Sequence, residues 1–378
     1  MAKAGIERSP QTIAAARHSR STLCFFNAFC ENLRSSLVSQ TSLSEFSLIE
    51  RFFERRALNR SPNDVDRAVL GIGDDCALIA PRAGQSLAIS TDMLVEGRHF
   101  FPGVDPHALG HKTLAVNLSD LAAMGAKPRA FTLAFALPDA REAWLAAFSD
   151  GLFELAERFD CELIGGDTTR GPLNLCVTVF GDVPPDLALR RDAARDGDDI
   201  WVSGTLGDAR AGLGVARGEW SVTGDDAASD TATFRRALER PEPRIALGIA
   251  LRGLARAALD ISDGLAGDLL HILERSRVNA SVDADAVPRS AALSRLSADV
   301  QRRCTLTGGD DYELCFTAPA ATREAIEAIG AEVKVPVTRI GTISTLKAAA
   351  DRPAITWHDS TGAPLSLTLQ GFDHFNAD

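Results

Sequence analysis

The pattern of hydrophobic and polar positions predicts an alternation of helices and strands. Apolar residues recur at helical spacing in SEFSLIERFFERR, where the folded part begins at residue 44. SLAISTDMLVEGRHF predicts a strand that ends in polar residues, and HALGHKTLAVNLSDLAAMGAKP predicts a helix that stops at Gly125 and Pro128. A strand, an amphipathic helix and two further strands follow in AFTLAFALP, EAWLAAFSDGLFELAERFD, CELIGGD and LNLCVTVFGDVP. This alternation favours an α/β sandwich with helices on one face of a sheet.

A second unit begins near DDIWVSGTLGDARAGL, where strand, glycine turn and helix recur. Residues 217–236 are polar and rich in Gly and Asp, so we expect a surface loop there. A helix over IALGIALRGLARAA and short strands over about 338–378 complete the pattern. With a boundary near residue 185, we expect a poorly ordered extension over 1–43, an N-terminal α/β domain over 44–185 and a C-terminal α+β domain over 186–378.

Composition narrows the class of protein. The chain has 378 residues and a net charge of −11, which disfavours a protein that coats nucleic acid or anionic membrane. This net charge does not exclude the binding of phosphorylated small molecules, because bound cations reverse the local sign of charge. Seven scattered cysteines without a CxxC pair indicate reduced thiols in a cytoplasmic protein. No apolar run reaches the length of a membrane span, so we expect no membrane partner.

The first 43 residues differ from the rest. They hold five basic and two acidic residues, and their apolar piece, LCFFNAF, is broken by Asn27. We interpret them as a loosely ordered extension or the product of an upstream start codon. A secretory signal is the less favoured alternative, because the cysteine pattern is that of a cytosolic protein.

Acidic residues recur at the predicted strand ends or in the turns that follow. A single such Asp is usually a turn residue, but several in one chain are hard to explain as turns alone. Loops at strand ends are where α/β proteins gather functional groups. Asp74 and Asp75 follow Gly73, and Asp92 and Asp167 end the segments AISTD and LIGGD. Asp260 and Asp263 lie in DISDG, and Asp310 and Asp311 lie in TGGDD.

One further acid, Asp120, lies within a predicted helix. Thr113, Asn117 and Asp120 share a face at i, i+4 and i+7. Polar stripes on helices usually face solvent. The rest of this helix is almost entirely apolar, so we expect the stripe to face a polar site.

Clustered carboxylates repel one another unless cations neutralise them. Mg²⁺ is held by one or two carboxylates together with water and substrate phosphates, so this set can hold several Mg²⁺ ions and, through them, a polyphosphate. Candidate hydroxyl and guanidinium donors accompany the acids at Ser90, Thr91, Thr168, Thr169, Arg170 and Arg191. The P-loop, protein-kinase, HExxH and GxSxG motifs are missing. The pattern indicates phosphoryl transfer by positioning and charge neutralisation.

The remaining polar candidates are weaker. His99 follows the Asp92 strand in EGRHF and is either a substrate contact or a structural histidine. We expect a packing or capping role for His271 and a packing role for Tyr312, the single tyrosine.

Taken together, the motifs resemble those of the bacterial thiamine-monophosphate kinase family from about residue 44 to the C-terminus. The resemblance implies an aminoimidazole ribonucleotide synthetase-like fold, in which an N-terminal sheet pairs across a homodimer and a C-terminal α+β domain follows. The segments that carry it, in order, are GIGDDCAL, AISTDMLVEGRHF, KTLAVNLSDLAAMGAKP, LIGGDTTRGPL, GTLGDARAGL, DISDGLAGDLLHI, GGDDYELCF and GFDHF.

The resemblance implies transfer of a phosphoryl group from ATP to thiamine monophosphate with several Mg²⁺ ions. It implies thiamine contacts at His99, Asp310 and Phe372, and ATP contacts at Gly166, Asp167, Arg191 and Ser262. Asp75, Asp120 and Asp263 would be catalytic, while Asp74 stays undecided. The implied metal ligands, direct or through water, are Asp75, Ser90, Thr91, Asp92, Asp120, Asp167, Asp260 and Asp263.

The substrate's own phosphate oxygen would be the nucleophile, and it is largely ionised near neutral pH. We therefore expect no strong general base, and we expect Asp75, Asp92, Asp120 and Asp263 to converge on one cleft.

Three alternative functions stay open. Another ATP-using enzyme of the superfamily, such as selenophosphate synthetase, would need a reactive thiol, for which Cys76 is the candidate. A metal-dependent phosphohydrolase would release phosphate, and a non-catalytic scaffold would bind ligands without turnover.

Overall fold

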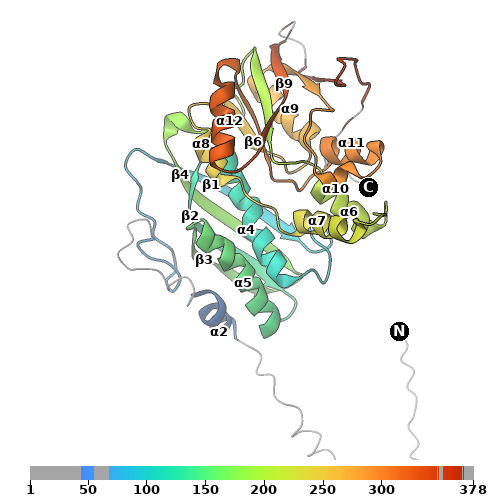
Figure 1. Cartoon of the computed structure of the whole chain (residues 1–378). Coiled ribbons are helices and arrows are strands. Elements are labelled where there is room, and N and C mark those ends of the chain that lie inside the picture. The colour runs from blue at the N-terminus through green and yellow to red at the C-terminus, as the bar shows by residue number, and fades with distance from the viewer. Residues whose placement is uncertain (1–43, 55–67, 347, 349–351, 368, 370–378) are drawn as a thin grey trace, which may run out of the picture. The chain divides into compact units, whose positions relative to one another are not determined.

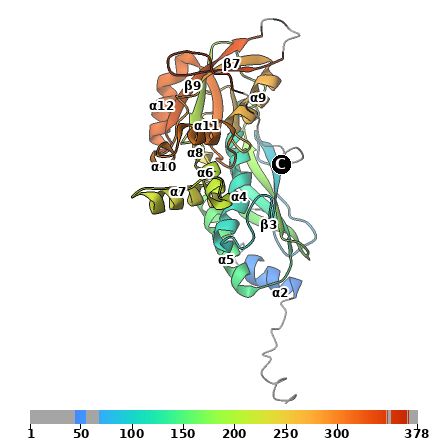
Figure 2. The same cartoon turned by 90° about the vertical axis from the view of Figure 1, so that its right-hand side faces the viewer.

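The computed structural model describes residues 44–54, 68–346, 348, 352–367 and 369. These residues form two β-sheets with helices packed against them (Figure 1; Figure 2), which confirms the α/β class that the hydrophobic pattern predicts. The extension over 1–43 and the predicted thiamine contact Phe372 lie outside the described residues.

The first sheet has four strands in the order β1 (Ser86–Val95), β4 (Asn174–Val183), β2 (Lys127–Leu137) and β3 (Glu162–Arg170). Its pairs are antiparallel except β2 and β3, which are parallel. A parallel pair needs a long crossover, and helix α5 (Glu142–Arg158) supplies it.

Helix α4 (Pro106–Ala123) packs beside α5 (Figure 1) and is buried along nearly its whole length. It begins at Asp105, whose carboxylate accepts hydrogen bonds from the backbone amides of His107 and Ala108. Its other contacts come from both parts of the fold: strands β1 and β4 of the first sheet, and α8 and β6 of the second unit. A helix enclosed in this way is buried on most of its faces, and its buried polar side chains, such as Asn117, find hydrogen-bond partners.

Strand β1 shows the period of two of a half-buried strand. Ser90 and Asp92 lie on the partly buried face toward α4, where both make hydrogen bonds to that helix. Alternate residues on the other face are exposed and mostly apolar: Leu87, Ile89, Thr91, Met93 and Val95. As an edge strand, β1 leaves one side of its backbone without a partner strand among the described residues.

The second sheet has six strands in the order β10 (Ile355–His358), β7 (Val278–Asp283), β9 (Val337–Thr345), β5 (Asp198–Ser203), β8 (Leu314–Pro319) and β6 (Ala257–Asp260). Only the β10–β7 pair is parallel. The core of this unit lies between the sheet and helix α9 (Leu265–Ser276), with Leu269, Ile272 and Val282 fully buried.

Shorter elements complete the described chain. The predicted first helix is α2 (Glu45–Ile49), followed by a π-helical turn η1 (Glu50–Glu54) that buries Phe52 and Phe53. The others are η2 (Pro185–Leu187), α6 (Asp208–Arg217), α7 (Ala227–Glu239), α8 (Ile245–Ala250), α10 (Ala291–Ser294), α11 (Ala298–Thr307), η3 (Ala320–Thr322) and α12 (Arg323–Glu332). The boundary near residue 185 stays a prediction.

Two element predictions are wrong. The expected loop over 217–236 contains the first ten residues of α7, which is stable because Phe234 is fully buried and Asp230 pairs with Arg295. The expected helix over IALGIALRGLARAA ends at Ala250. A turn follows it, and Ala257 then begins strand β6.

The placement of the acids at strand ends is also partly wrong. Asp92 and Asp167 lie inside β1 and β3, and Asp310 lies between helix α11 and strand β8. Asp260 ends strand β6 and Asp263 lies in the turn after it, as predicted. The acids therefore come from strand faces and helix–strand connections as well as from strand ends.

Candidate active site

A cavity of about 650 Å³ brings together acidic residues from both sheets, and we call it the acidic cleft. Strand β1 contributes Asp92, helix α4 contributes Asp120, and the end of β6 with the following turn contributes Asp260 and Asp263. Further predicted site residues that line it are Ser90, His99, Arg191, Ser262 and Asp310. Nine of the predicted site residues therefore meet in one place.

Hydrogen bonds tie β1 to α4 at the floor of the cleft. The hydroxyl of Ser90 donates to Oδ2 of Asp120 at 2.6 Å, and the backbone amide of Asp92 donates to Oδ1 of Asn117 at 3.0 Å. The Asn117 amide group in turn donates to the carbonyl of Thr113. These contacts confirm that Asn117 and Asp120, two members of the predicted stripe, face a polar site.

Burial raises the pKa of three carboxyl groups in the cleft, and neighbouring carboxylates add to the effect for Asp92 and Asp260. Burial raises the pKa of Asp92 to about 6, and the neighbouring charges of Asp120 and Asp263 add to the effect. Burial, followed by the charge of Asp120, raises the pKa of Asp260 to about 8. The pKa of Asp120 is also raised by burial, against the Ser90 hydrogen bond and the charge of Arg191. A cluster of this kind favours a cation that relieves the repulsion.

The turn after β6 is held in shape by Asp268, which sequence reasoning missed. The backbone amides of Ser262 and Asp263 each donate to Oδ2 of Asp268 at 3.0 Å. Asp268 lies in the first turn of α9 and is buried, and burial raises its pKa to about 7. Its spacing of five residues from Asp263 in DISDGLAGD was the available signal, since an acid in the first turn of a helix accepts nearby backbone amides.

Residues 310–313 run beside this turn and present Asp310 to the cleft. The amide of Asp310 donates to the carbonyl of Ser262, and the amide of Tyr312 donates to the carbonyl of Ile261. The hydroxyl of Tyr312 donates to Oδ1 of Asp310 at 3.1 Å. Tyr312 is buried, as its predicted packing role requires, and it also fixes a site carboxylate.

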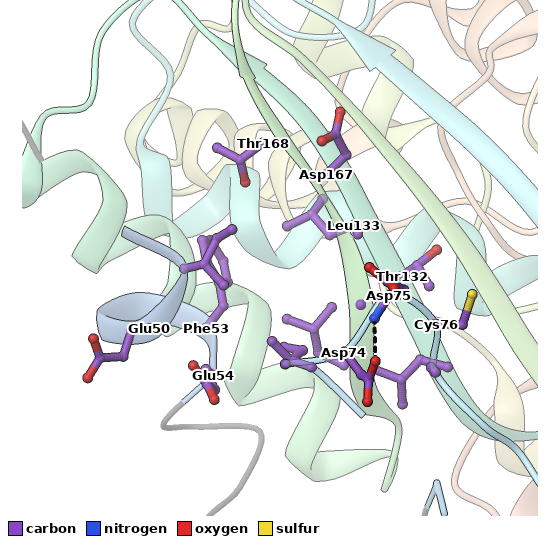
Figure 3. Close-up of a pocket in the computed structure, with 18 of the residues that line it drawn as sticks. Glu50, Phe53, Glu54, Asp74, Asp75, Cys76, Thr132, Leu133, Asp167 and Thr168 are labelled. Carbon is purple, nitrogen blue, oxygen red and sulfur yellow. Dashed lines mark hydrogen bonds between the residues drawn. The ribbon is translucent and has the colours of Figure 1, made fainter. Parts of the chain in front are cut away.

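Three predicted site residues line a different cavity of about 760 Å³, which we call the glycine-loop pocket. These are Asp75, Gly166 and Asp167, of which Figure 3 labels Asp75 and Asp167. The carboxylate of Asp74 accepts a hydrogen bond from the amide of Asp75 at 2.9 Å (Figure 3), as expected of an acid that caps its own turn. Within one chain, Asp75 therefore lines a different cavity from Asp92, Asp120 and Asp263, and the convergence of all four acids stays a prediction about an assembly of chains.

Two other predictions find a structural explanation. Gly166 has φ of 152°, and a Cβ there would lie 1.8 Å from the carbonyl oxygen of Leu133 on β2. Close strand packing thus requires this glycine.

Thr91 lies on the exposed face of β1, where its hydroxyl is hydrogen-bonded to that of Thr178 at 2.8 Å. Thr91 is therefore separated from Ser90 and Asp92 by the alternation of the strand.

The fold and the acidic cleft define a member of the AIR synthase related class. The model of the AIR synthase related protein N-terminal domain matches residues 73–183, and that of the C-terminal domain matches 195–348. The chain is 48% identical to the thiamine-monophosphate kinase of Escherichia coli over 88% of its own length and 98% of that protein. The chain belongs to the thiamine-monophosphate kinase family.

Solved structures agree with this assignment. The crystal structure of the thiamine-monophosphate kinase from Stenotrophomonas maltophilia is 49% identical, with a TM-score of 0.74 over 86% of this chain and 98% of that one. AaThiL complexed with AMPPCP and TMP is 27% identical, with a TM-score of 0.65 over 88% of this chain and 97% of that one.

Within the described residues, no helix combines the length and hydrophobicity that a membrane span requires.

Proposed function

We propose that this protein transfers the γ-phosphoryl group of ATP to thiamine monophosphate, which gives thiamine diphosphate and ADP. The observation that carries the proposal is the acidic cleft, where Asp92, Asp120, Asp260 and Asp263 from two parts of the fold line one cavity with Arg191. The family relatives support it by name, and AaThiL is solved with an ATP analogue and TMP. We place the activity in the cytoplasm, without nucleic acid or membrane as a partner.

The donors of the cleft fit Mg²⁺. The part of the chain that the structure describes holds no group of three or more His, Cys, Asp or Glu side chains arranged to hold a metal ion by themselves. Mg²⁺ does not need one, because it keeps several waters and binds through one or two carboxylates and substrate phosphates. Asp92, Asp120 and Asp260 would hold it, since they line one cleft and burial, with the charge of Asp120 added for Asp92 and Asp260, raises their pKa values. When bound, Mg²⁺ neutralises the phosphates of both substrates.

The side chains of the cleft then have distinct tasks. Arg191 offers a forked donor for phosphate oxygens. Ser90 orients Asp120, and Asp268 holds the amides of Ser262 and Asp263. The attacking group is the phosphate of thiamine monophosphate, which is largely ionised at neutral pH, so the protein holds two anions in line rather than removing a proton.

We assign His99 and Asp310 to the organic end of the acceptor. Nδ1 of His99 accepts a hydrogen bond from the amide of Val95 at 3.0 Å, so its Nε2 carries the proton and can donate. Asp310 supplies a negative charge that suits the cationic thiazolium ring. Both residues also line a small apolar cavity of about 70 Å³ beside the cleft.

We further propose that the chain works as a homodimer. The exposed face of edge strand β1 carries Leu87, Ile89 and Met93 with 44%, 59% and 53% exposure, and apolar faces of this kind are typical of interfaces. In a symmetric dimer, the glycine-loop pocket of one chain can serve the acidic cleft of the other. The roles of Asp75, Thr91, Gly166 and Asp167 as metal or ATP ligands are proposals of this kind.

Product analysis tests the proposed function. The protein is incubated with ATP, Mg²⁺ and thiamine monophosphate, and thiamine diphosphate, thiamine and phosphate are quantified. The proposal predicts thiamine diphosphate. Release of thiamine and phosphate would instead show a phosphohydrolase, and binding without turnover would show a scaffold.

A further inference from the structure

Lys112 is a buried lysine on α4 whose ammonium group has two partners. The side chain is 4% exposed, and Nζ lies 3.2 Å from Oδ2 of Asp310 and 3.0 Å from the carbonyl oxygen of Leu238. Leu238 is in the last turn of α7, where carbonyl groups lack helical partners and a cation is favourable. Burying an ammonium group is costly unless it is paired, so this arrangement needs both partners.

The carboxylate of Asp310 is held from both sides. Lys112 approaches Oδ2, and the Tyr312 hydroxyl donates to Oδ1 at 3.1 Å. The backbone of Asp310 has φ of 68°, which is uncommon outside glycine, and its amide donates to the Ser262 carbonyl. Contacts to Lys112 and Tyr312 therefore hold this carboxylate in its direction.

The Lys112–Asp310 pair lies at the junction of two cavities. Both residues line the small apolar cavity, and Asp310 and His99 also line the acidic cleft. Asp120 follows Lys112 by eight residues on the same helix, which is about 12 Å along the axis. One rigid helix thus carries a carboxylate at the phosphoryl-transfer end and a lysine at the other end of the site.

We propose that Lys112 is a positioning residue that holds the Asp310 carboxylate in the orientation which binds the organic, cationic end of the acceptor. This inference rests on the proposed function. Lys112 lines the small cavity beside Asp310, and its ammonium group is engaged by the Asp310 carboxylate and the Leu238 carbonyl, so it would act on the acceptor through Asp310, while α4 fixes its spacing from Asp120 in the acidic cleft. Loss of Lys112 should weaken acceptor binding selectively and leave the ATP side of the site unchanged.

The competing explanation is that Lys112 only caps the end of α7, and the chain offers a matched control for it. The neighbouring His111 is also buried, and its Nε2 is 2.8 Å from the carbonyl oxygen of Pro241, just beyond the end of α7. Its polar contact is therefore with the same region and not with Asp310. His111→Leu removes this contact, and Lys112→Met removes the lysine contact to Leu238 together with that to Asp310.

The experiment compares KM for thiamine monophosphate, KM for ATP, kcat and Tm in the full-length wild type, Lys112→Met and His111→Leu. We expect Lys112→Met to raise KM for thiamine monophosphate by about tenfold or more. This is the change that corresponds to the loss of one hydrogen bond to a charged group. KM for ATP in Lys112→Met should stay within about twofold of the wild-type value, a change too small to represent the loss of such a hydrogen bond. His111→Leu should lower Tm without the selective rise, and Lys112→Arg should recover part of the loss.

A double variant completes the test. If Lys112 acts through Asp310, then Lys112→Met combined with Asp310→Asn should have the same KM for thiamine monophosphate as Asp310→Asn alone. Additive effects, an unchanged KM in Lys112→Met, or an equal rise in His111→Leu would overturn the proposal. A wild type that forms no thiamine diphosphate would instead refute the proposed function, so the two failures are distinguishable.

Discussion

The hydroxyl of Ser90 donates a 2.6 Å hydrogen bond to Oδ2 of Asp120, and this bond joins edge strand β1 to helix α4 inside the acidic cleft. A carboxylate accepts several hydrogen bonds or cations at once, so a single donor orients Asp120 and leaves acceptor positions for Mg²⁺. The two residues are thirty positions apart in the chain, and their contact depends on the packing of α4 against β1.

Substitution at Asp120 should separate catalysis from folding. Asp120→Asn should lower kcat by about two to three orders of magnitude, as expected when one group that stabilises the transferring charge is lost. The Tm of the metal-free protein should not fall, because the change removes a carboxyl group whose charged form is disfavoured by burial. Steady-state kinetics and thermal unfolding of the same preparation measure both effects.

A matched variant at Ser90 tests the orienting bond. Ser90→Ala keeps the carboxylate and removes its donor, so it should raise the Mg²⁺ concentration for half-maximal activity by about tenfold, the equivalent of a charged hydrogen bond. A Ser90→Ala enzyme with unchanged Mg²⁺ dependence would show that Asp120 needs no orientation.

The cleft predicts an unusual pH dependence of stability. Asp260 has an ordinary pKa of 3.8 and a folded-state pKa of about 8, so between these values the folded protein holds a proton that the unfolded chain has lost. The metal-free protein should therefore lose stability as pH rises from about 5 to 8. Mg²⁺ should reverse the loss, because it binds only the folded, ionised cluster.

Thermal unfolding with a chelator, repeated across this pH range, measures the effect. Asp260→Asn cannot ionise, so its Tm should fall less steeply with pH than that of the wild type. Parallel curves for the two proteins would mean that Asp260 is ionised in the folded state at neutral pH.

Substitution of Gly166 tests whether this glycine is needed for the packing of the fold, apart from any contact to a ligand. A Cβ at this position would collide with the Leu133 carbonyl, whereas one at Gly165 would meet only the Thr132 methyl group at 4.0 Å. Gly166→Ala should therefore destabilise the protein by about 1–3 kcal/mol, the usual cost of overpacking. Gly165→Ala, the matched control, should leave the free energy of unfolding nearly unchanged. Chemical denaturation that finds the two variants equally stable would contradict the close β2–β3 contact.

The division of the acids between two cavities predicts complementation between subunits. Asp75→Asn and Asp263→Asn should each be nearly inactive. If Asp75 of one subunit serves the cleft of the other, a co-refolded equal mixture should recover about a quarter of wild-type activity, because half of the dimers are mixed and each has one intact site. If both acids serve the site of their own chain, every site in the mixture lacks one of them and no activity returns.

Much of this site could be predicted from local sequence. The apolar surroundings of Asn117 and Asp120 marked a polar stripe, and the structure places both beside β1. The glycine-flanked DISDG segment marked Asp260 and Asp263, which line the cleft. Local signals sufficed here because helical periodicity and turn chemistry act over a few residues.

Other features depend on contacts that the local sequence does not contain. Residues 217–236 are polar, yet helix α7 forms there because Phe234 is buried and Arg295, far along the chain, pairs with Asp230. Lys112 has the composition of a surface lysine and is buried because Asp310, almost two hundred residues away, neutralises it. Asp75 matches its family motif, but the tertiary fold places it in the glycine-loop pocket.

The most direct test of the central claim follows the phosphoryl group itself. The wild type is mixed with γ-labelled ATP, thiamine monophosphate and Mg²⁺, and the label is traced through a single turnover. Direct transfer between two anions held in the acidic cleft predicts that the label appears in thiamine diphosphate in a one-to-one ratio with ADP, and that Asp120→Asn slows this step by about two to three orders of magnitude. Label released as free phosphate, or transfer at the wild-type rate in Asp120→Asn, would contradict the account.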